Sequence, residues 1–166
     1  ASLAVLLRET TTLPDGDTAS VVVMGNLAAG LKLRVLDEDT ARPGGAMARL
    51  RLLHAWPLVG AVDAFVTRAD QTLTGREPSH RLGGYESLSS YADVKGDGRL
   101  RITPAGRIDL VLFDSASIGL ADNQVATLVV SPASSAARVA LTVLPQGLPA
   151  YVLANTVATS QIGRAT

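Results

Sequence analysis

The residues best suited to catalysis in this chain are its two histidines, His54 and His80. A histidine acts as a general base when a nucleophile and an orienting carboxylate lie beside it. No such grouping stands out, and the sequence contains no Gly-x-Ser-x-Gly nucleophile elbow. We therefore interpret His54, at a predicted strand end, as a packing or turn hydrogen-bonding residue, and His80 as a solvated loop residue. The sequence predicts no enzyme and no catalytic residue.

Acidic residues offer a second kind of chemistry, because calcium takes about six to eight oxygen ligands. The candidates are Asp93, Asp97, Asp122 and the acidic run 37–39. Lys95 falls between the first two, where a cation would oppose a metal ion. Turns explain Asp97 and Asp122 without a metal, and the acidic run is typical of a solvated linker. We predict no metal site and no cofactor.

An aromatic platform for a sugar is the third possibility, with Trp56, Tyr85 and Tyr91 as its candidates. Aromatic residues make up only 4% of the chain, which weakens this interpretation. The alternative is that Trp56 covers one end of a folded domain or an inter-domain contact. The two tyrosines would then pack with their hydroxyls at the edge of the domain.

Composition excludes several classes of partner. The 15 basic and 15 acidic residues give a net charge of zero, which argues against nucleic acid and against a polybasic membrane patch. Charged residues are only 18% of the chain, so little repulsion opposes self-association. No apolar run approaches the roughly 20 residues of a membrane span.

Cysteine is absent, which excludes disulfides and thiolate chemistry and is compatible with a bacterial export product. The first residue is Ala, so we expect a processed chain or a fragment boundary. The predicted location is secreted or at the bacterial cell surface, with the periplasm as an alternative.

The elements that would position these residues are almost all β-strands. Short runs rich in Val, Leu, Ile and Thr alternate with Gly, Pro, Asp and Asn. Alternation around Arg49–Arg51 and Arg99–Arg101 predicts a sheet with one solvated face, and Asp97-Gly98 predicts a hairpin turn. Residues 70–82 are expected to form a loop. The predicted strands are 3–8, 18–24, 32–37, 48–55, 61–67, 88–94, 98–103, 109–115, 124–131, 138–144 and 150–158.

One stretch of the chain occurs twice. Residues 13–23 align without a gap with residues 120–130, an offset of 107 (120 minus 13). Self-similarity at a fixed offset indicates a repeat architecture. The first copy has only the back half of a domain, so three strands in residues 3–36 should match those around 109–144. The predicted organisation is a half repeat (1–37), a linker (38–46), a full domain (47–145) and an extra strand with a tail (146–166).

Residues 48–66 carry a family resemblance. Ala-Arg-Leu-Arg-Leu-Leu-His-Ala-Trp-Pro at 48–57, followed by Ala-Val-Asp-Ala-Phe-Val at 61–66, resembles the opening of the bacterial domain of unknown function 4397. Short motifs at 84–85, 91–94, 101–106 and 120–122 resemble its later strands, so the resemblance covers about residues 46–144. Trp56 and Leu58 depart from the family pattern, as does the turn at 67–68. The resemblance implies an immunoglobulin-like sandwich, often in tandem, in exported or surface proteins, and no established activity.

The predicted fold class is all-β: an immunoglobulin-like antiparallel β-sandwich, with one full repeat preceded by a half repeat. Its interior should contain residues from at least five of the strands. They are Leu50, Leu52, Val62, Ile102, Leu110, Leu112, Leu128 and Val130.

Both ends of the chain carry uncharged β-formers, whereas natural proteins protect free strand edges with charge or proline. The C-terminal run either adds a strand to its own domain or fills the half repeat, in this chain or a neighbour. We therefore expect a non-enzymatic structural protein that self-associates head-to-tail by strand sharing into a fibre or array. The alternative is a monomeric surface module that binds a glycan or peptide. The candidate assembly residues are Leu3, Val5, Leu7, Trp56, Tyr151, Leu153 and Val157.

Overall fold

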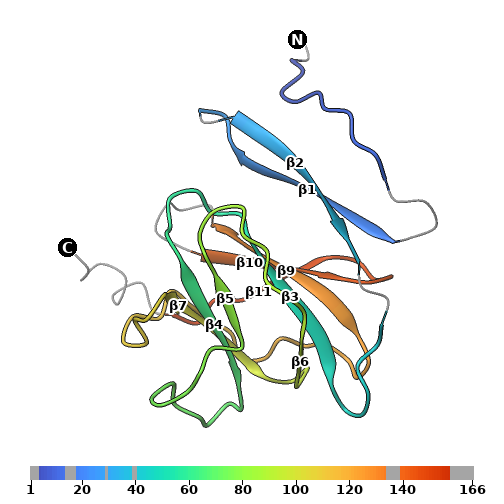
Figure 1. Ribbon diagram of the computed structural model, residues 1–166. Coiled ribbons are helices and arrows are strands. Elements are labelled where there is room, and N and C mark those ends of the chain that lie inside the picture. Colours follow the sequence, from blue (N-terminus) through green and yellow to red (C-terminus); the bar gives the residue numbers. More distant parts are fainter. Residues whose placement is uncertain (1–3, 14–17, 29, 39–40, 134–138, 158–166) are drawn as a thin grey trace. The chain divides into compact units, whose positions relative to one another are not determined.

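The computed structural model describes residues 4–13, 18–28, 30–38, 41–133 and 139–157. Its contacts divide the chain into two compact units, Ala1–Ala41 and Arg42–Thr166. The regular elements of the described residues are all β-strands (Figure 1). The described residues contain no helix that is long and apolar enough to cross a membrane.

The first unit contains one antiparallel hairpin, β1 (Ala19–Asn26) paired with β2 (Gly30–Asp37). Residues 4–13, which precede it, are described and form no strand, so the predicted strand at 3–8 is wrong over its described part. Its first residue, Leu3, lies outside the described residues. The expectation of three strands in residues 3–36 therefore fails, because only two form among the described residues of this segment.

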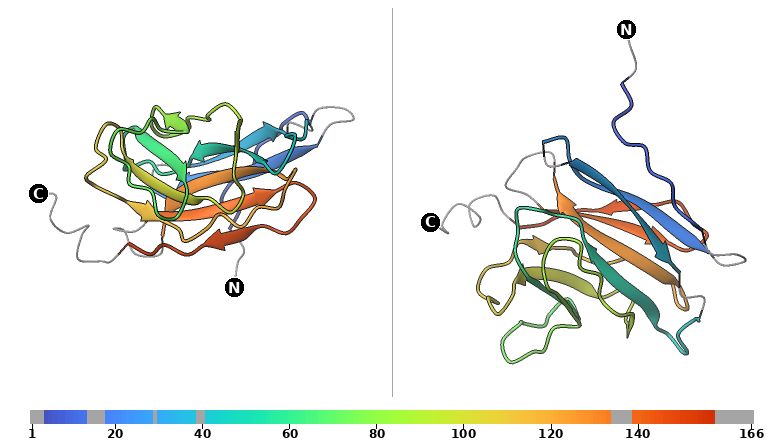
Figure 2. Two further views of the ribbon diagram at one scale, coloured as in Figure 1. Left: turned by 90° about the horizontal axis from the view of Figure 1, so that it is seen from below. Right: turned by 45° about the horizontal axis from the view of Figure 1, so that its top comes forward.

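The second unit is a β-sandwich, and the predicted all-β sandwich class is confirmed. Its two sheets lie face to face in the views of Figures 1 and 2. One has the order β11-β10-β9-β3-β6 and the other β5-β4-β7-β8. The bounds in the first sheet are β3 (Ala48–His54), β6 (Ala92–Val94), β9 (Val125–Pro132), β10 (Val139–Pro145) and β11 (Tyr151–Leu153). Those in the second are β4 (Val62–Thr67), β5 (His80–Leu82), β7 (Arg99–Pro104) and β8 (Phe113–Asp114).

Strand pairing is antiparallel except at the centre of the larger sheet, where β3 runs parallel to β9. The sequence predicts a purely antiparallel sandwich, so this pair is a departure. It means that the first strand of the domain lies beside the penultimate hairpin, and residues about 75 positions apart in sequence become neighbours. Leu52, for example, is opposite Leu128.

The core between the sheets contains six of the eight predicted residues, all fully buried; they are Leu50, Leu52, Val62, Ile102, Leu128 and Val130. Leu110 and Leu112 are only half-buried. The reason is a turn in which the Leu110 N–H donates to the Arg107 carbonyl, so that strand β8 begins only at Phe113. Phe113 is fully buried instead.

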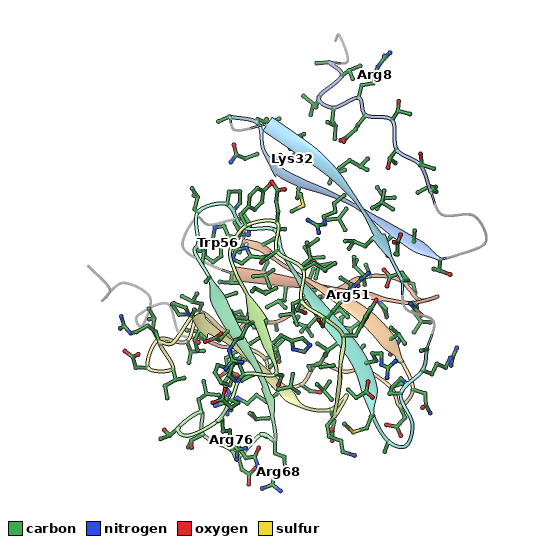
Figure 3. The ribbon with its side chains drawn as sticks, in the orientation of Figure 1. Arg8, Lys32, Arg51, Trp56, Arg68 and Arg76 are labelled. Atoms are coloured by element: carbon green, nitrogen blue, oxygen red, sulfur yellow. The ribbon has the colours of Figure 1, made fainter. Side chains whose placement is uncertain are left out.

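The face predicted to be solvated is partly covered. Arg51 and Arg101 are 7% exposed. Arg51, labelled in Figure 3, donates from Nε to Thr127 Oγ1 at 3.0 Å. Its guanidinium carbon lies 4.6 Å from the centre of the Tyr91 ring, a cation–π contact. The alternation of arginine with apolar residues correctly predicted which side chains lie on the outer face of each sheet. It carries no information about the loops that cover that face.

The Lys95–Gly98 segment is a turn, with the Gly98 N–H donating to the Lys95 carbonyl at 3.0 Å, but it does not close a hairpin. It joins β6 to β7, which belong to different sheets. Gly98 has no positive φ, in contrast to the expectation. The glycines of this turn are required for close packing: a Cβ on Gly96 would lie 2.0 Å from the Leu120 carbonyl oxygen.

Candidate functional site

The outer edge of β1 is the strongest candidate site in the described residues, and its geometry follows from the register of the hairpin. The Glu38 N–H donates to the Thr18 carbonyl at 2.9 Å, so this is a hydrogen-bonded pair. Such pairs alternate along an antiparallel ladder. In β1 the even-numbered residues therefore bond to β2, and the backbone groups of Ala19, Val21 and Val23 point away from it.

A contact on β2 supports this assignment. Val23 is opposite Leu33, so Leu33 should also direct its backbone groups away from the hairpin. The Leu33 N–H indeed donates to Glu9 Oε2 at 3.2 Å, outside the ladder. On the β1 side, the described residues pair β1 with β2 alone.

The hairpin β9–β10 in the sandwich has the same hydrogen-bond pattern at an offset of 107. There the Gln146 N–H donates to the Val125 carbonyl, so odd-numbered residues of β9 bond to β10. The even-numbered residues bond to β3: the Ala55 N–H donates to the Val130 carbonyl at 2.8 Å. The outward residues Val21 and Val23 thus correspond to the β3-facing residues Leu128 and Val130.

The two hairpins differ in how far these corresponding side chains are buried. Leu128 and Val130 are 0% and 1% exposed, because β3 and the opposite sheet cover them. Val21 and Val23 are 50% and 58% exposed. Two branched apolar side chains therefore face solvent in a strand without a charged residue between Ala19 and Asn26. Natural sheets usually protect such an edge, so this one is suited to binding another strand.

The C-terminal run lies on its own domain, which is one of the two alternatives that the sequence left open. Tyr151–Leu153 pairs with β10, Leu153 belongs to the core, and the Tyr151 hydroxyl donates to the Ile118 carbonyl at 2.9 Å. Burial raises the pKa of Tyr151. The predicted strand 150–158 is shorter than expected, because residues 154–157 leave the sheet. Val157 is half-buried, and its N–H donates to the Asn155 side chain at 3.0 Å.

The other predicted assembly residues have different environments in the two units. Trp56 is 7% exposed and belongs to the core, so it is not presented to a partner (Figure 3). The same burial removes it from any sugar platform. Tyr91 packs under Arg51, and Tyr85 is half-buried in a turn. Val5 is 70% exposed and Leu7 half-buried in the segment before the hairpin, and Leu3 is not described.

Three predicted metal candidates line one cavity of about 970 Å³ at an end of the sandwich: Asp93, Asp97 and Asp122. Within the described residues, however, no group of three possible ligands is close enough to hold an ion. Asp93 is paired with Arg49, with Nε and Nη2 at 2.7 and 3.1 Å from its two oxygens, and this bond lowers its pKa. Lys95 also lines the cavity, and its Nζ donates to the Ala46 carbonyl.

His54 has the hydrogen-bonding role that the sequence predicted. Its Nε2 lies 3.0 Å from the Gly60 carbonyl, and the Trp56 N–H donates to its Nδ1 at 3.3 Å. A neutral ring protonated at Nε2 satisfies both contacts. The ring is fully buried, and burial lowers its pKa.

The prediction of a solvated His80 is wrong. The segment 70–82 ends in strand β5, which the sequence did not indicate, and His80 is 4% exposed there. Its Nε2 lies 3.0 Å from the Leu50 carbonyl on the opposite sheet. Nδ1 is buried with no hydrogen-bond partner. Burial lowers the pKa of His80 as well.

Comparison with known proteins adds one match. The model of the family described as Domain of unknown function (DUF4397) matches residues 1–65. The family predicted from the sequence is confirmed. The match extends over β1, β2, β3 and most of β4, whereas the resemblance was expected over about 46–144. A search of the curated proteins found no match.

The DUF4397 match includes both the candidate edge on β1 and the strand β3 that pairs with the corresponding edge of β9. The sequence predicts a repeat that would relate β1 to β9, but it does not predict the direction of the backbone groups. That direction depends on hydrogen-bond parity, and the 107-residue offset is informative here because it preserves the order of outward and inward residues along the strand.

Proposed function

We propose that this chain is a non-enzymatic structural protein of the bacterial exterior, secreted or held at the cell surface, which self-associates by sharing β-strands into a fibre or tandem array. The observation that carries the proposal is the edge of β1. As in β9, alternate residues of β1 direct their backbone groups away from the other strand of the hairpin. Val21 and Val23 of β1 are exposed, whereas the corresponding Leu128 and Val130 of β9 are covered by β3 and the facing sheet.

The energetics favour completion of that edge. Each strand added to a sheet satisfies a row of backbone donors and acceptors together. Covering a valine side chain contributes about 1.5 kcal/mol or more at about 25 cal/mol per Å². The zero net charge of the chain adds little repulsion between copies. The rings of His54 and His80 lie within hydrogen-bond distance of backbone carbonyls, which agrees with a structural role for both residues.

Sedimentation velocity over a range of concentrations, together with negative-stain electron microscopy, tests the proposal. We expect large, concentration-dependent species for the unmodified chain. A variant with Val21→Lys and Val23→Lys places two charges at the edge and should sediment as a smaller species. Leu58→Lys, at a position 82% exposed in the sandwich, is the matched control and should assemble normally. A full-length chain that stays monomeric at high concentration would contradict the proposal.

The alternative, a monomeric module that binds a surface glycan or peptide, has one observation in its favour. The cavity of about 970 Å³ is lined by Arg68, Gln71 and Asp97 among other polar residues, which suits a polar ligand. A monomeric protein that binds members of a saccharide panel, and loses this binding in Asp97→Asn, would favour this function over the structural one.

A further inference from the structure

The pairing of β3 with β9 shows how the edge of β9 is completed. The Arg49 N–H donates to the Gln124 carbonyl at 2.8 Å, and the Ala55 N–H to the Val130 carbonyl at 2.8 Å. These two contacts delimit a parallel ladder in which Leu52 is opposite Leu128. The partner of this edge is thus a strand parallel to it, with leucines directed into the core and arginines on the other face.

The same arrangement can be transferred to β1 residue by residue. With the offset of 107, Ala126, Leu128 and Val130 correspond to Ala19, Val21 and Val23. A strand like β3 placed beside β1 would receive hydrogen bonds from the N–H groups of Val21 and Val23. Its leucines would cover the two exposed valines.

A polar contact carries over as well. In the sandwich, Arg51 of β3 donates to the hydroxyl of Thr127 in β9, and both residues are buried. The residue that corresponds to Thr127 in β1 is Ser20, which also has a hydroxyl. An arginine at the same position of an incoming strand would therefore find an acceptor there.

In this chain, and so in every folded copy of it, β3 cannot supply that strand, because it is hydrogen-bonded on one edge to β6 and on the other to β9. We propose that the outer edge of β1 receives, in parallel, the unpaired first strand of a separate module of the same kind, with the pattern Ala-Arg-Leu-Arg-Leu-Leu-His of β3. This inference rests on the proposed function, in which β1 accepts a strand, and it specifies which strand β1 accepts and in which direction.

A synthetic peptide with the sequence of residues 46–57 is the probe, added to the isotope-labelled full chain. Amide hydrogen exchange followed by NMR is the readout. The peptide should slow exchange at the outward amides of Val21 and Val23. The amides of Ser20 and Val22 already bond to β2 and should change less. A control peptide with Leu50→Ser and Leu52→Ser should give no protection.

A double-mutant cycle tests the arginine contact. Ser20→Ala should weaken binding of the peptide roughly three- to tenfold, the range for one hydrogen bond. The peptide with Arg51→Ala should lose a similar factor against the unmodified chain and almost nothing further against the Ser20→Ala variant. Independent, multiplicative losses would show that the two residues do not meet.

The outcomes separate this inference from the proposed function. If the chain assembles but the peptide protects neither Val21 nor Val23, the parallel β3-type strand is overturned and strand sharing of another kind stands. If the peptide protects these amides while the chain alone remains monomeric at high concentration, the inference holds and self-association fails. Protection confined to β6 or β11 would overturn the inference, because the peptide would then bind another edge.

Discussion

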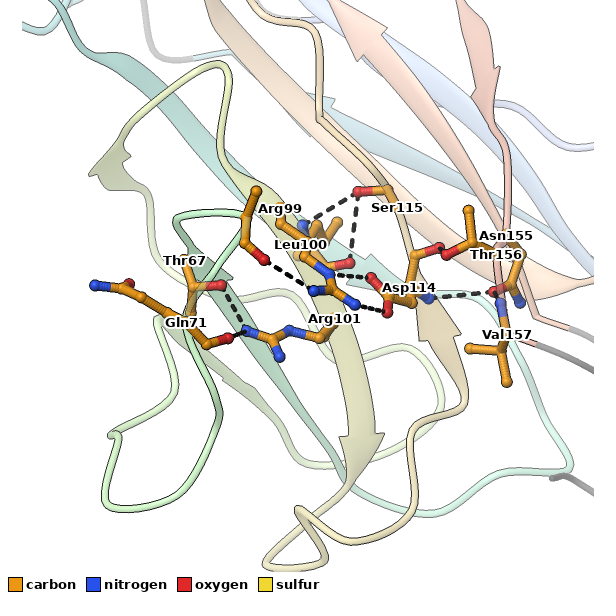
Figure 4. A network of polar contacts seen from close by, with 11 residues as sticks. Thr67, Gln71, Arg99, Leu100, Arg101, Asp114, Ser115, Asn155, Thr156 and Val157 are labelled. Atoms are coloured by element: carbon orange, nitrogen blue, oxygen red, sulfur yellow. Dashed lines mark hydrogen bonds and ion pairs between the residues drawn. The ribbon is translucent and has the colours of Figure 1, made fainter.

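Asn155 joins the end of the described chain to the edge of the opposite sheet through Asp114. Its Oδ1 accepts the Asp114 N–H at 3.2 Å (Figure 4). Its Nδ2 donates to the Leu112 carbonyl at 3.2 Å. The following residue, Thr156, donates its N–H to the Asp114 carbonyl at 2.8 Å. Asp114 in turn binds Arg99 through both carboxylate oxygens. Residues 155–156 therefore fasten β8, a strand of only two residues.

Replacing Asn155 by Ala should destabilise the sandwich by about 1–3 kcal/mol, since it leaves two backbone N–H groups and two carbonyls with fewer partners. Urea denaturation followed by tryptophan fluorescence measures this, because Trp56 lies in the core. Thr156→Val is the matched control, as it removes a hydroxyl contact to Asp114 but keeps the backbone bond, and should cost less than about 1 kcal/mol. Equal effects would mean that the bridge through Asn155 is not the important contact.

The sequence suggests that deleting residues 148–166 abolishes assembly and leaves the central sandwich folded. The placement of β11 changes that expectation, because Leu153 is part of the core. Leu153→Ala should cost about 2–4 kcal/mol, whereas Val152→Ala, at a neighbouring position 67% exposed, should stay within about 0.5 kcal/mol. Thermal unfolding of both variants checks the contrast. A deletion that leaves the melting temperature unchanged would show that β11 is dispensable.

Stability should fall as the pH is lowered from about 6.5 to about 5, because of the two buried histidines. Burial lowers the pKa of His54 and of His80 below the ordinary value. The unfolded state therefore binds more protons in this range, and stability is complete above about pH 6.5 and is lost below it.

Urea denaturation midpoints at several pH values measure the slope of the free energy of unfolding against pH. His80→Gln keeps a donor for the Leu50 carbonyl and removes one titrating group, so its slope should be smaller by up to about 1.4 kcal/mol per pH unit. The pKa of Asp93 is lowered by Arg49, so that carboxylate titrates below this range. A His80→Gln variant with an unchanged slope would contradict the assignment.

Gly96→Ala should destabilise the sandwich by several kcal/mol, since the added Cβ would lie 2.0 Å from a backbone carbonyl that cannot move independently of its loop. Gly44→Ala is the control, because a Cβ added there would have nothing within 4 Å and its φ is not positive. It should be neutral or slightly stabilising. Comparable folding of the two variants in urea would show that the 95–98 turn can shift away from Leu120.

Alternation and turn chemistry were sufficient to predict the sandwich and most of its core. Leu50, Leu52 and Ile102 follow from a period of two. The short strands were harder: β5 has three residues and begins with His80, so it carries almost no periodic signal. The burial of His80 depends on the carbonyl of Leu50, which is 30 positions away and on another sheet.

The candidate site was predictable only in part. The 107-residue offset predicts that residues 19–26 correspond to β9, but the parallel partner β3 is a feature of the fold that no local pattern indicates. Val5 and Tyr151 were predicted to take part in assembly because they lie in uncharged runs near the ends of the chain. The structure instead places Tyr151 on its own sheet and leaves the exposed valines on β1.

Assembly through β1 should persist, or strengthen, as ionic strength rises. No charged residue occurs from Ala19 to Gly25, so the contact depends on backbone hydrogen bonds and on burial of Val21 and Val23. Salt shortens the Debye length from about 10 Å at 0.1 M to about 3 Å at 1 M, which weakens ion pairs between exposed residues and leaves apolar burial intact. Sedimentation at these two salt concentrations distinguishes the two kinds of contact. Dissociation at high salt would instead assign assembly to charged residues elsewhere on the chain.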